Sequence, residues 1–347
     1  MTRRTDAAIL FETGSPLRIV SLEIPPLQPG QVLVEVSYSG VCASQLLEVR
    51  GKRGPDRFLP HALGHEGSGV VLATGEGVTK VQTGDRVVLS WIRGSGATVP
   101  STVYGSRMGA INSGAISTFM RETITCESCV IRIPGSMPLR EAALLGCAVL
   151  TGGGIVRNTA RVGRGASVAV FGIGGIGLSA VLVAALVGAD PIMAIDVFDH
   201  KLEHARKVGA THTVNARKQD VRAKVLKITK GHGADFAIEA AGRTETMQTA
   251  LEIVREKGGL CVLAGNLPRG ERISIDPFDL IKGKRLVGSW GGESDPDHDI
   301  PFFVDQFVSG KLRMGELITH EYRLEEVNAA LDELERGNVG RSLIRMQ

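Results

Sequence analysis

SVAVFGIGGIGLSAVLVAALVGADPIMAID, residues 167–196, is the stretch that decides the fold of this chain. A short β-branched run, Val168–Phe171, leads into a glycine cluster, and a helix-length apolar segment and a second short apolar run follow. Strand, tight turn, helix and strand in this order predict a βαβ unit of a parallel sheet. The second run ends at Asp196, about 20 residues past the glycines, which is the spacing of dinucleotide-binding units.

The glycine cluster predicts where the phosphates of a dinucleotide bind. The first glycine permits the tight turn, the second lets the backbone approach a pyrophosphate, and the third lets the helix pack close to the strand. The helix N-terminus adds free N–H groups and the positive end of the helix dipole. An ordinary βαβ turn without a ligand is the alternative. The predicted cofactor-binding residues of this turn are Gly172, Gly174, Gly175, Ile176 and Gly177.

Asp196 indicates which dinucleotide binds. A carboxylate at the end of this strand accepts hydrogen bonds from the two hydroxyls of an adenosine ribose and repels a 2′-phosphate. The sequence from Asp196 to Lys201 reads DVFDHK and places no arginine beside the acid. We therefore predict NAD as the cofactor in preference to NADP.

Length and composition favour a globular protein of two domains. The chain has 347 residues, of which 43% are apolar and 22% charged, and its net charge of +3 does not suggest a nucleic-acid partner. The longest apolar run is about half a membrane span, and Glu12 interrupts the N-terminal apolar residues, so we expect neither a membrane segment nor a signal peptide. Five cysteines without a framework spacing predict a reducing, cytoplasmic compartment.

The order of the predicted elements separates two kinds of structure. Residues 7–90 contain short alternating strands bounded by glycine and proline, and residues 91–114 are rich in glycine and serine and predict a surface lobe. Strands and helices then alternate until about residue 290, which predicts a doubly wound parallel sheet in an α/β protein. We assign 1–151 and 291–347 to a β-rich catalytic domain and 152–290 to a Rossmann domain.

Two cysteines and a histidine are candidate zinc ligands. Cys42 lies in GVCAS, His65 in GHEGSG and Cys147 in LLGCA. Two thiolates and an imidazole form one of the known ligand sets of catalytic zinc. Taken singly, each has another explanation, because buried cysteines usually pack in a core and a histidine beside glycine usually lies in a loop.

These motifs, together with GEGVTKVQTGDRV at residues 75–87 and the glycine turn, resemble the zinc-containing medium-chain alcohol dehydrogenases over essentially the whole chain. The resemblance implies a GroES-like catalytic domain, an inserted Rossmann domain that binds NAD, and one catalytic zinc. It also implies hydride transfer between NAD(H) and an alcohol or polyol, or its carbonyl counterpart. A small-molecule substrate and a homo-oligomer, either dimer or tetramer, are expected.

The resemblance also implies roles for single residues. Cys42, His65 and Cys147 correspond to the zinc ligands, and Glu66 to a carboxylate near the metal that touches zinc in some states. Ser44 is similar to the hydroxyl that hydrogen-bonds the substrate oxygen and takes its proton. The corresponding cofactor contacts are Thr151 at the nicotinamide, Lys201 at a ribose, Arg243 on the adenosine side and Arg341 at the pyrophosphate.

Two departures from the family pattern limit the analogy. Relatives with a second, structural zinc carry four cysteines in a lobe, and the corresponding residues here are Ser95, Thr98, Ser101 and Gly109, so we expect no structural zinc. The histidine that passes protons to solvent in many relatives is replaced by Leu47. The residue after Cys42, often cationic in the family and in contact with phosphate, is Ala43.

Other interpretations stay open. A zinc-free reductase of the quinone or enoyl type would keep the cofactor but not the metal, although the complete ligand trio argues against it. A NAD-binding protein without enzymatic activity is a third possibility. Cys126-Glu-Ser-Cys129 can be a redox pair or a thiol metal site, but a turn with incidental thiols is favoured. His61 can face the cleft, with a loop position favoured.

Overall fold

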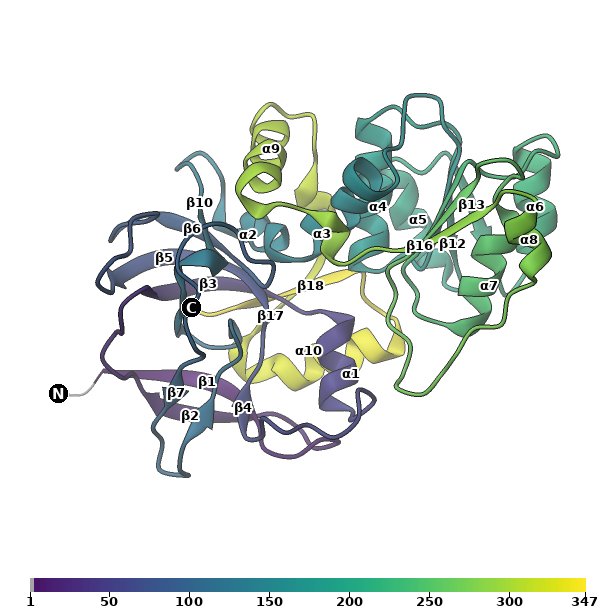
Figure 1. Ribbon diagram of the computed structural model, residues 1–347. Coiled ribbons are helices and arrows are strands. Elements are labelled where there is room, and N and C mark those ends of the chain that lie inside the picture. Colours follow the sequence, from purple (N-terminus) through teal and green to yellow (C-terminus); the bar gives the residue numbers. More distant parts are fainter. Residues whose placement is uncertain (1–2) are drawn as a thin grey trace. The chain divides into compact units, whose positions relative to one another are not determined.

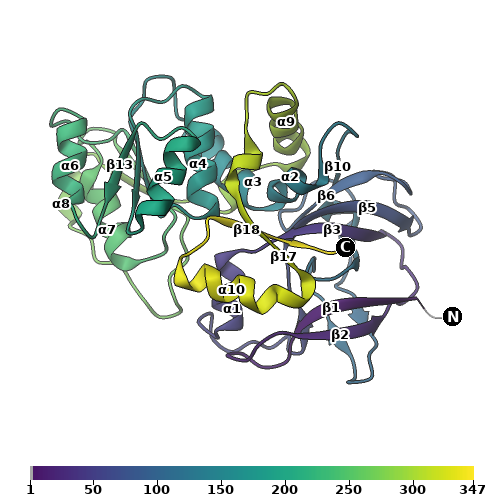
Figure 2. The ribbon, with the colours of Figure 1, turned by 180° about the vertical axis from the view of Figure 1, so that it is seen from behind.

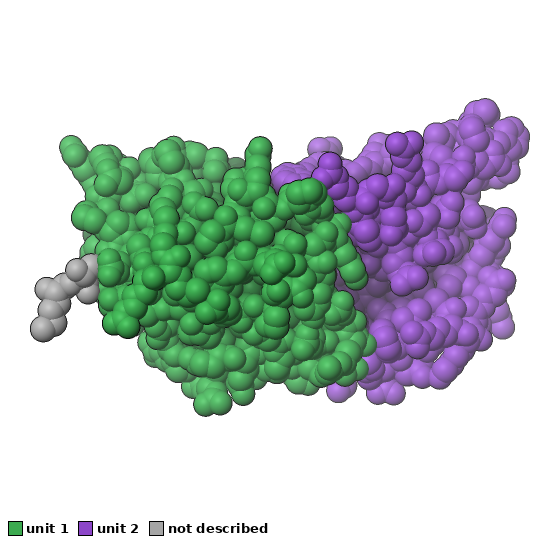
Figure 3. Space-filling view, turned by 90° about the horizontal axis from the view of Figure 1, so that it is seen from below, with its two compact units in different colours: residues 1–147, 295–309, 318–347 green, residues 148–294, 310–317 purple. Residues whose placement is uncertain are grey.

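The computed structural model describes residues 3–347 (Figure 1, and from behind in Figure 2). The chain divides into two compact units, coloured separately in Figure 3. Unit 1 comprises Met1–Cys147, Asp295–Ser309 and Ile318–Gln347. Unit 2 comprises Ala148–Ser294 and Gly310–Leu317.

Unit 1 is built on two β-sheets. The first has the order β2-β1-β4-β8-β7, and the second β10-β6-β5-β3-β18-β17, with β9 also paired to β3. The strands of the first sheet are β1 (Arg4–Leu10), β2 (Arg18–Glu23), β4 (His61–Ala62), β7 (Val103–Tyr104) and β8 (Ile111–Asn112). Those of the second are β3 (Gln31–Gly40), β5 (Glu66–Thr74), β6 (Arg86–Ser90), β9 (Glu122–Cys126), β10 (Val130–Arg132), β17 (Ile318–Arg323) and β18 (Arg341–Arg345).

Consecutive apolar residues let a single strand of unit 1 contribute to two cores. In β1, Ala8 and Leu10 join one apolar cluster while Ala7 and Ile9 join another. Successive side chains of a strand point to opposite faces, so a strand with apolar residues at every position is buried on both sides. The first cluster combines residues of both sheets with one face of the helix α10 (Val327–Arg336), which also contacts α1 (Ala43–Val49).

The remaining helical segments of unit 1 are short, apart from α9. They are η1 (Glu127–Cys129), α2 (Leu139–Ala142), η2 (Ala143–Gly146), α9 (Pro296–Val308) and η6 (Leu324–Glu326). Residues 139–150 do not form one continuous helix, because the helical conformation is interrupted at Cys147, whose φ is −150°. The reason is the packing of Gly146, because a Cβ there would collide with the backbone of Leu89 and with Glu66.

Unit 2 contains a six-stranded parallel sheet with the order β13-β12-β11-β14-β15-β16. Its strands are β11 (Val168–Phe171), β12 (Ile192–Asp196), β13 (His212–Asn215), β14 (Phe236–Glu239), β15 (Leu260–Leu263) and β16 (Arg285–Gly288). The chain runs outward from β11 to β13 and returns to start β14 beside β11, so the strand order reverses between β11 and β14. In doubly wound sheets this reversal marks the ligand-binding edge, at the carboxyl ends of the strands. The predicted α/β fold is confirmed.

Helices surround this sheet (Figure 1). They are α3 (Ala148–Gly154), η3 (Ile155–Thr159), α4 (Gly175–Leu186), α5 (Asp199–Lys207), α6 (Val221–Ile228), α7 (Thr244–Ile253), α8 (Pro277–Ile281), η4 (Gly291–Glu293) and η5 (Met314–Leu317). The predicted domains place residues 148–151 and 291–294 in the first domain, whereas they belong to unit 2. The same difference holds for Gly310–Leu317. This segment lies with unit 2 because His204 Nε2 contacts the Glu316 carbonyl at 2.5 Å and Arg313 donates to the Lys207 carbonyl.

Among the helices of residues 3–347, no single one has the length and apolar composition needed to cross a membrane. One bent pair, Leu139–Gly146 with Ala148–Thr159, reaches that length and composition only when its two members are counted together.

Candidate active site

Unit 1 brings the three predicted zinc ligands together. One potential ligand atom from each of Cys42, His65 and Cys147 lies within 4.8 Å of the other two. Zinc bonds of about 2.3 Å to sulfur and 2.1 Å to nitrogen place tetrahedral ligand atoms roughly 3.5–4 Å apart, so the trio fits a zinc ion with three protein ligands. Both cysteines are buried and His65 is partly exposed, which leaves one side open to a fourth ligand.

Strand pairing explains how two of these residues meet. Cys42 follows β3 and His65 precedes β5, and the two strands are antiparallel neighbours, with Ser39 opposite Gly67. The end of β3 and the start of β5 therefore lie at the same edge of the sheet. The chain turns into His65 at Gly64, whose φ of +92° favours glycine and whose missing Cβ leaves room for the backbone of Phe119.

Cys147 reaches the trio from the end of the short helix η2. The helix η2 packs against β5 and β6, and Ser90 Oγ in β6 donates a hydrogen bond of 2.9 Å to the Gly146 carbonyl. The interruption of the helix at Cys147 turns its thiol toward Cys42. The sequence predicted the ligand but not the broken helix that presents it.

The electrostatic environment favours the thiolate form of Cys42. The hydrogen bond from Cys147 lowers the pKa of the Cys42 thiol well below its ordinary value, against the effect of burial, and His65 and Arg341 lower it further. A thiolate is the form that binds metals. Gln45, which sequence analysis did not single out, accepts a 3.3 Å hydrogen bond from the Cys42 backbone N–H. Gln45 is the third residue of α1, the position of the glutamine in a capping box. This position could have predicted its contact with Cys42 from the sequence.

Glu66 and Arg341 form an ion pair close to this trio. Glu66 begins β5 and is fully buried, and Arg341 begins β18 with 4% of its surface exposed. Arg341 Nη1 also donates a 2.6 Å hydrogen bond to the Val41 carbonyl, and burial lowers the pKa of its guanidinium, against the effect of Cys42. Arg341, predicted to contact a pyrophosphate, therefore has Glu66 and Val41 as its partners within unit 1.

Ser44 lies in the first turn of α1, two residues after Cys42. Its hydroxyl is partly exposed and donates a 3.3 Å hydrogen bond to Cys42 Sγ. Leu47, one turn later, is partly exposed, and Ala43 is exposed. The candidate proton acceptor is thus next to the ligand trio and open on one side.

Unit 2 presents the predicted glycine turn at the carboxyl end of β11. Gly172 has a φ of +83°, and a Cβ there would collide with Ala241. A Cβ at Gly177 would collide with the Gly172 carbonyl, so the first turn of α4 packs directly on the end of the strand. Gly174, the N-cap of α4, has open space where its Cβ would be, and Gly175 and Ile176 follow it in the first turn. That open space is the side from which a pyrophosphate can approach the backbone.

Asp196 ends β12, as predicted, and its carboxylate is held beside the glycine turn. One oxygen accepts a 2.7 Å hydrogen bond from the Ile173 N–H, and the other accepts from the N–H groups of Val197 and Phe198. Burial lowers the pKa of Lys201, while Asp196 opposes this shift. The predicted ribose-binding residues Asp196 and Lys201 therefore lie near each other at the end of β12.

Thr151 and Arg243 complete the predicted cofactor residues of unit 2. Thr151 lies in α3, and its buried Oγ1 has no hydrogen-bond partner in the part of the chain that the structure describes. A buried hydroxyl without a hydrogen-bond partner destabilises the protein, and a bound ligand can supply that partner. This position therefore fits a cofactor contact. Arg243, the N-cap of α7, is exposed and lies 3.5 Å from Glu245.

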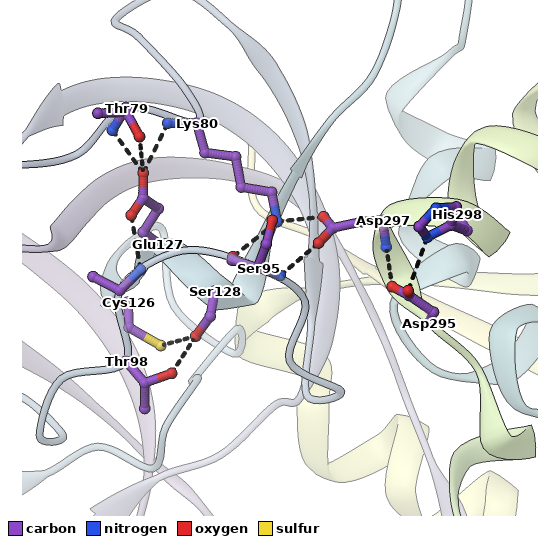
Figure 4. A network of polar contacts seen from close by, with 11 residues as sticks. Thr79, Lys80, Ser95, Thr98, Cys126, Glu127, Ser128, Asp295, Asp297 and His298 are labelled. Carbon is purple, nitrogen blue, oxygen red and sulfur yellow. Dashed lines mark hydrogen bonds and ion pairs between the residues drawn. The ribbon is translucent and has the colours of Figure 1, made fainter.

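The lobe that lacks the four cysteines is attached by two carboxylates (Figure 4). Glu127 accepts hydrogen bonds from the backbone N–H groups of Thr79, Lys80 and Ala97 at 2.6–2.8 Å. Asp297, in the first turn of α9, accepts from the Ser95 N–H and pairs with Lys80 Nζ, both at 2.5 Å. The sequence alone did not predict these contacts, since the partners of both carboxylates lie far from them along the chain.

A second group of potential ligands lies near the end of α1. His61 Nε2 contacts Asp56 Oδ2 at 2.7 Å and Glu48 Oε1 at 3.8 Å. His61 belongs to β4 and is buried, so the favoured loop position was wrong. An imidazole paired with two carboxylates explains this group without a metal.

A β-rich unit with a Cys₂His trio and a Rossmann unit together define a zinc-binding dehydrogenase. Residues 28–135 match the alcohol dehydrogenase GroES-like domain, and residues 175–309 match the zinc-binding dehydrogenase family. An S-(hydroxymethyl)glutathione dehydrogenase of Synechocystis sp. is 34% identical, covering 98% of this chain and 99% of the relative. The chain therefore belongs to the zinc-containing medium-chain alcohol dehydrogenase family.

Solved structures agree with this assignment. An alcohol dehydrogenase zinc-binding domain protein from Burkholderia ambifaria has a TM-score of 0.93 at 29% identity and covers both chains completely. Benzyl alcohol dehydrogenase from Acinetobacter calcoaceticus has a TM-score of 0.90 at 28% identity, covering 99% of this chain and 100% of that one. The protein is an alcohol dehydrogenase-like oxidoreductase, with zinc and NAD(H) as its expected cofactors and small-molecule alcohols as its substrate class.

Proposed function

We propose that Cys42, His65 and Cys147 hold one zinc ion in a site for hydride transfer between NAD(H) and an alcohol or its carbonyl counterpart. The convergence of the three ligand atoms within 4.8 Å carries this proposal. The lowered pKa of Cys42 supports it, because the thiolate is the form that binds a metal. A zinc-free reductase of the quinone or enoyl type would have no use for such a trio.

Ser44 is the proposed proton acceptor. Bound zinc supplies a Lewis acid that makes a substrate hydroxyl more acidic. The Ser44 hydroxyl can accept a hydrogen bond from the substrate hydroxyl while it donates one to Cys42. It takes the substrate proton only as it passes its own proton to a water molecule, so its O–H must turn from Cys42 toward that water. Its partial exposure lets water take the proton onward without a histidine at position 47.

Glu66 and Arg341 are proposed to position the Cys42 ligand. Arg341 holds the Val41 carbonyl, one residue before Cys42, and Glu66 neutralises the buried guanidinium. A contact of Glu66 with zinc and a contact of Arg341 with the pyrophosphate remain predictions.

In unit 2, we propose that the glycine turn binds the pyrophosphate and that Asp196 binds the adenosine ribose. The open space at Gly174 supports the first assignment, and the position of the carboxylate beside Ile173 supports the second. Thr151 at the nicotinamide, Lys201 at a ribose and Arg243 on the adenosine side complete the proposed contacts. A homo-oligomer, dimer or tetramer, and a cytoplasmic location remain predictions.

The proposed function is tested by the absorbance of NADH at 340 nm with a panel of alcohols. The panel contains benzyl alcohol, the adduct of formaldehyde with glutathione, a polyol and short aliphatic alcohols. We expect NAD-dependent oxidation of at least one member, and its loss in Cys147→Ser. Reduction of quinones by the zinc-free protein would favour the reductase instead. Tight NAD binding without turnover of any member, in protein shown to contain zinc, would favour a non-enzymatic protein.

A further inference from the structure

Two cysteines outside the proposed active site lie in direct contact. Cys126 ends β9 and Cys129 ends η1, and their sulfur atoms are 3.3 Å apart. Residues three apart in a 3₁₀ turn are separated by about 6 Å along the axis, which lies in the range that a disulfide spans between Cα atoms. Both thiols are free and buried. A disulfide between them therefore needs a small local movement and no change of fold.

The surroundings of Cys126 stabilise a thiolate. Ser128 Oγ lies 3.2 Å from its sulfur (Figure 4). The hydrogen bond with Cys129 lowers the pKa of Cys126 to about 5 against the effect of burial, and Ser128, the Val99 backbone and Arg93 lower it further. The same contact raises the pKa of Cys129. The pair thus consists of one nucleophilic thiolate and one adjacent thiol, as in sites that form disulfides reversibly.

The other cysteines do not share these properties. Cys42 and Cys147 belong to the proposed zinc site. Cys261 lies in β15, where burial raises the pKa of its thiol to about 12. Oxidation follows thiolate character and exposure. Cys126 and Cys261 are both buried, with 3% and 0% of their surface exposed, so thiolate character distinguishes them and we expect Cys126 to react first.

We propose that Cys126 and Cys129 form a reversible dithiol–disulfide site that is oxidised by hydroperoxides. The Cys126 thiolate attacks an oxygen of the peroxide, the O–O bond breaks, and the sulfur becomes a sulfenic acid. When the oxidant is hydrogen peroxide, the leaving group is hydroxide, which takes up one proton and departs as water. The Cys129 sulfur then attacks the Cys126 sulfur and releases a second water, which carries the Cys129 proton. Two electrons pass from the two thiols to one peroxide. A small dithiol reverses the reaction by thiol–disulfide exchange.

The position of this pair gives the oxidation a local consequence. Glu127 stands between the two cysteines in η1 and holds the backbone of Thr79, Lys80 and Ala97 (Figure 4). Thr98 Oγ1 in the lobe contacts Ser128 Oγ at 2.9 Å. A disulfide that tightens η1 therefore acts on the contacts that attach the lobe. Two arginines of the lobe, Arg93 and Arg107, are exposed and are sites at which trypsin can cleave it.

The test uses the full-length, zinc-loaded protein and hydrogen peroxide, followed by peptide mapping by mass spectrometry. We expect a crosslinked Cys126–Cys129 peptide that has lost two hydrogens and that dithiothreitol restores. Cys129→Ser leaves no resolving thiol, so dimedone is expected to trap a sulfenic acid at Cys126. Cys261→Ser is the matched control and is expected to form the disulfide as wild type does.

A second measurement does not depend on any variant. Alkylation of the native wild-type protein by iodoacetamide at pH 6 is expected to label Cys126 at least about tenfold faster than Cys261, because the thiolate is the nucleophile. The proposal is overturned if Cys126 reacts only after unfolding in denaturant, or if peroxide yields sulfonic acid without the crosslink. Loss of one zinc per chain in Cys126→Ser would also overturn it, since it would show a thiol metal site. None of these outcomes depends on dehydrogenase activity.

Discussion

Glu66 and Arg341 form an ion pair in the interior of unit 1, where the exposed fractions of their side chains are 0% and 5%. The two residues begin strands from opposite ends of the sequence, β5 and β18. Arg341 also binds the Val41 carbonyl, so the pair connects the last strand of the chain to the loop that carries Cys42. Removing one member of a buried pair leaves the other charge uncompensated.

We predict that Glu66→Gln lowers the free energy of unfolding by about 3 kcal/mol. Glu23→Gln, which removes an exposed carboxylate 3.4 Å from Arg4, is the matched control and should cost less than about 1 kcal/mol. Urea unfolding followed by circular dichroism measures both. A loss at Glu66→Gln no larger than that of the control would show that the pair does not stabilise unit 1.

The carboxylate of Asp196 is predicted to set the preference for NAD. Asp196→Ala should reduce the ratio of kcat/KM with NAD to that with NADP by at least about tenfold, because ribose hydrogen bonds and charge repulsion are both lost. Asp196→Asn keeps an oxygen acceptor for Ile173 and isolates the contribution of the charge. The prediction is wrong if the wild-type enzyme already prefers NADP or if both variants keep the wild-type ratio.

Glu127 is predicted to stabilise the lobe in a pH-dependent manner. Burial raises its pKa, but the backbone hydrogen bonds from Ala97, Thr79 and Lys80 outweigh it, so the folded-state pKa lies below the ordinary 4.5. A carboxyl group with a depressed folded-state pKa stabilises the protein above its unfolded pKa and loses this effect as the pH falls through the folded value.

The variant Glu127→Gln should therefore be less stable than wild type by about 2 kcal/mol at pH 7, and this difference should shrink below about pH 4.5. Urea unfolding at pH 7 and at pH 3.5 measures the difference, and Glu23→Gln again serves as the exposed control. A deficit of equal size at both pH values would contradict the role of the charge.

Placing a histidine at Leu47 is predicted to have little effect on alcohol oxidation. The Ser44 hydroxyl is partly exposed, so water can carry the proton away, and Leu47→His should change kcat less than about threefold between pH 6 and 9. Deuterated alcohol shows in each protein whether hydride transfer limits the rate. A rise of tenfold or more, about 1.4 kcal/mol of barrier, would show that proton exit is limiting.

The sequence predicted the local elements and motifs better than the long-range contacts. Val168–Phe171 forms β11 and Asp196 ends β12, as expected, because the βαβ unit is determined by neighbouring residues. The zinc trio was predicted from the resemblance of its three motifs to those of the alcohol dehydrogenase family. The spacing along the chain does not by itself show that residues 42 and 147 meet.

The contacts that escaped prediction depend on how distant segments pack. The partner of Arg341 is Glu66, and neither the sequence spacing nor the residue types identify it. Gly310–Leu317 lies with unit 2 through contacts between side chains and distant backbone carbonyls, which no spacing along the chain predicts. The helical conformation is interrupted at Cys147, directly after Gly146, which is a weak helix former and packs closely on β5 and β6.

The zinc content of the purified protein tests the central claim most directly. Elemental analysis of protein prepared without added zinc should give about one zinc per chain in the wild type, almost none in Cys147→Ser, and an unchanged amount in the control Cys126→Ser. Two tightly held zinc ions per chain, or a content that Cys147→Ser does not reduce, would contradict a single zinc held by Cys42, His65 and Cys147.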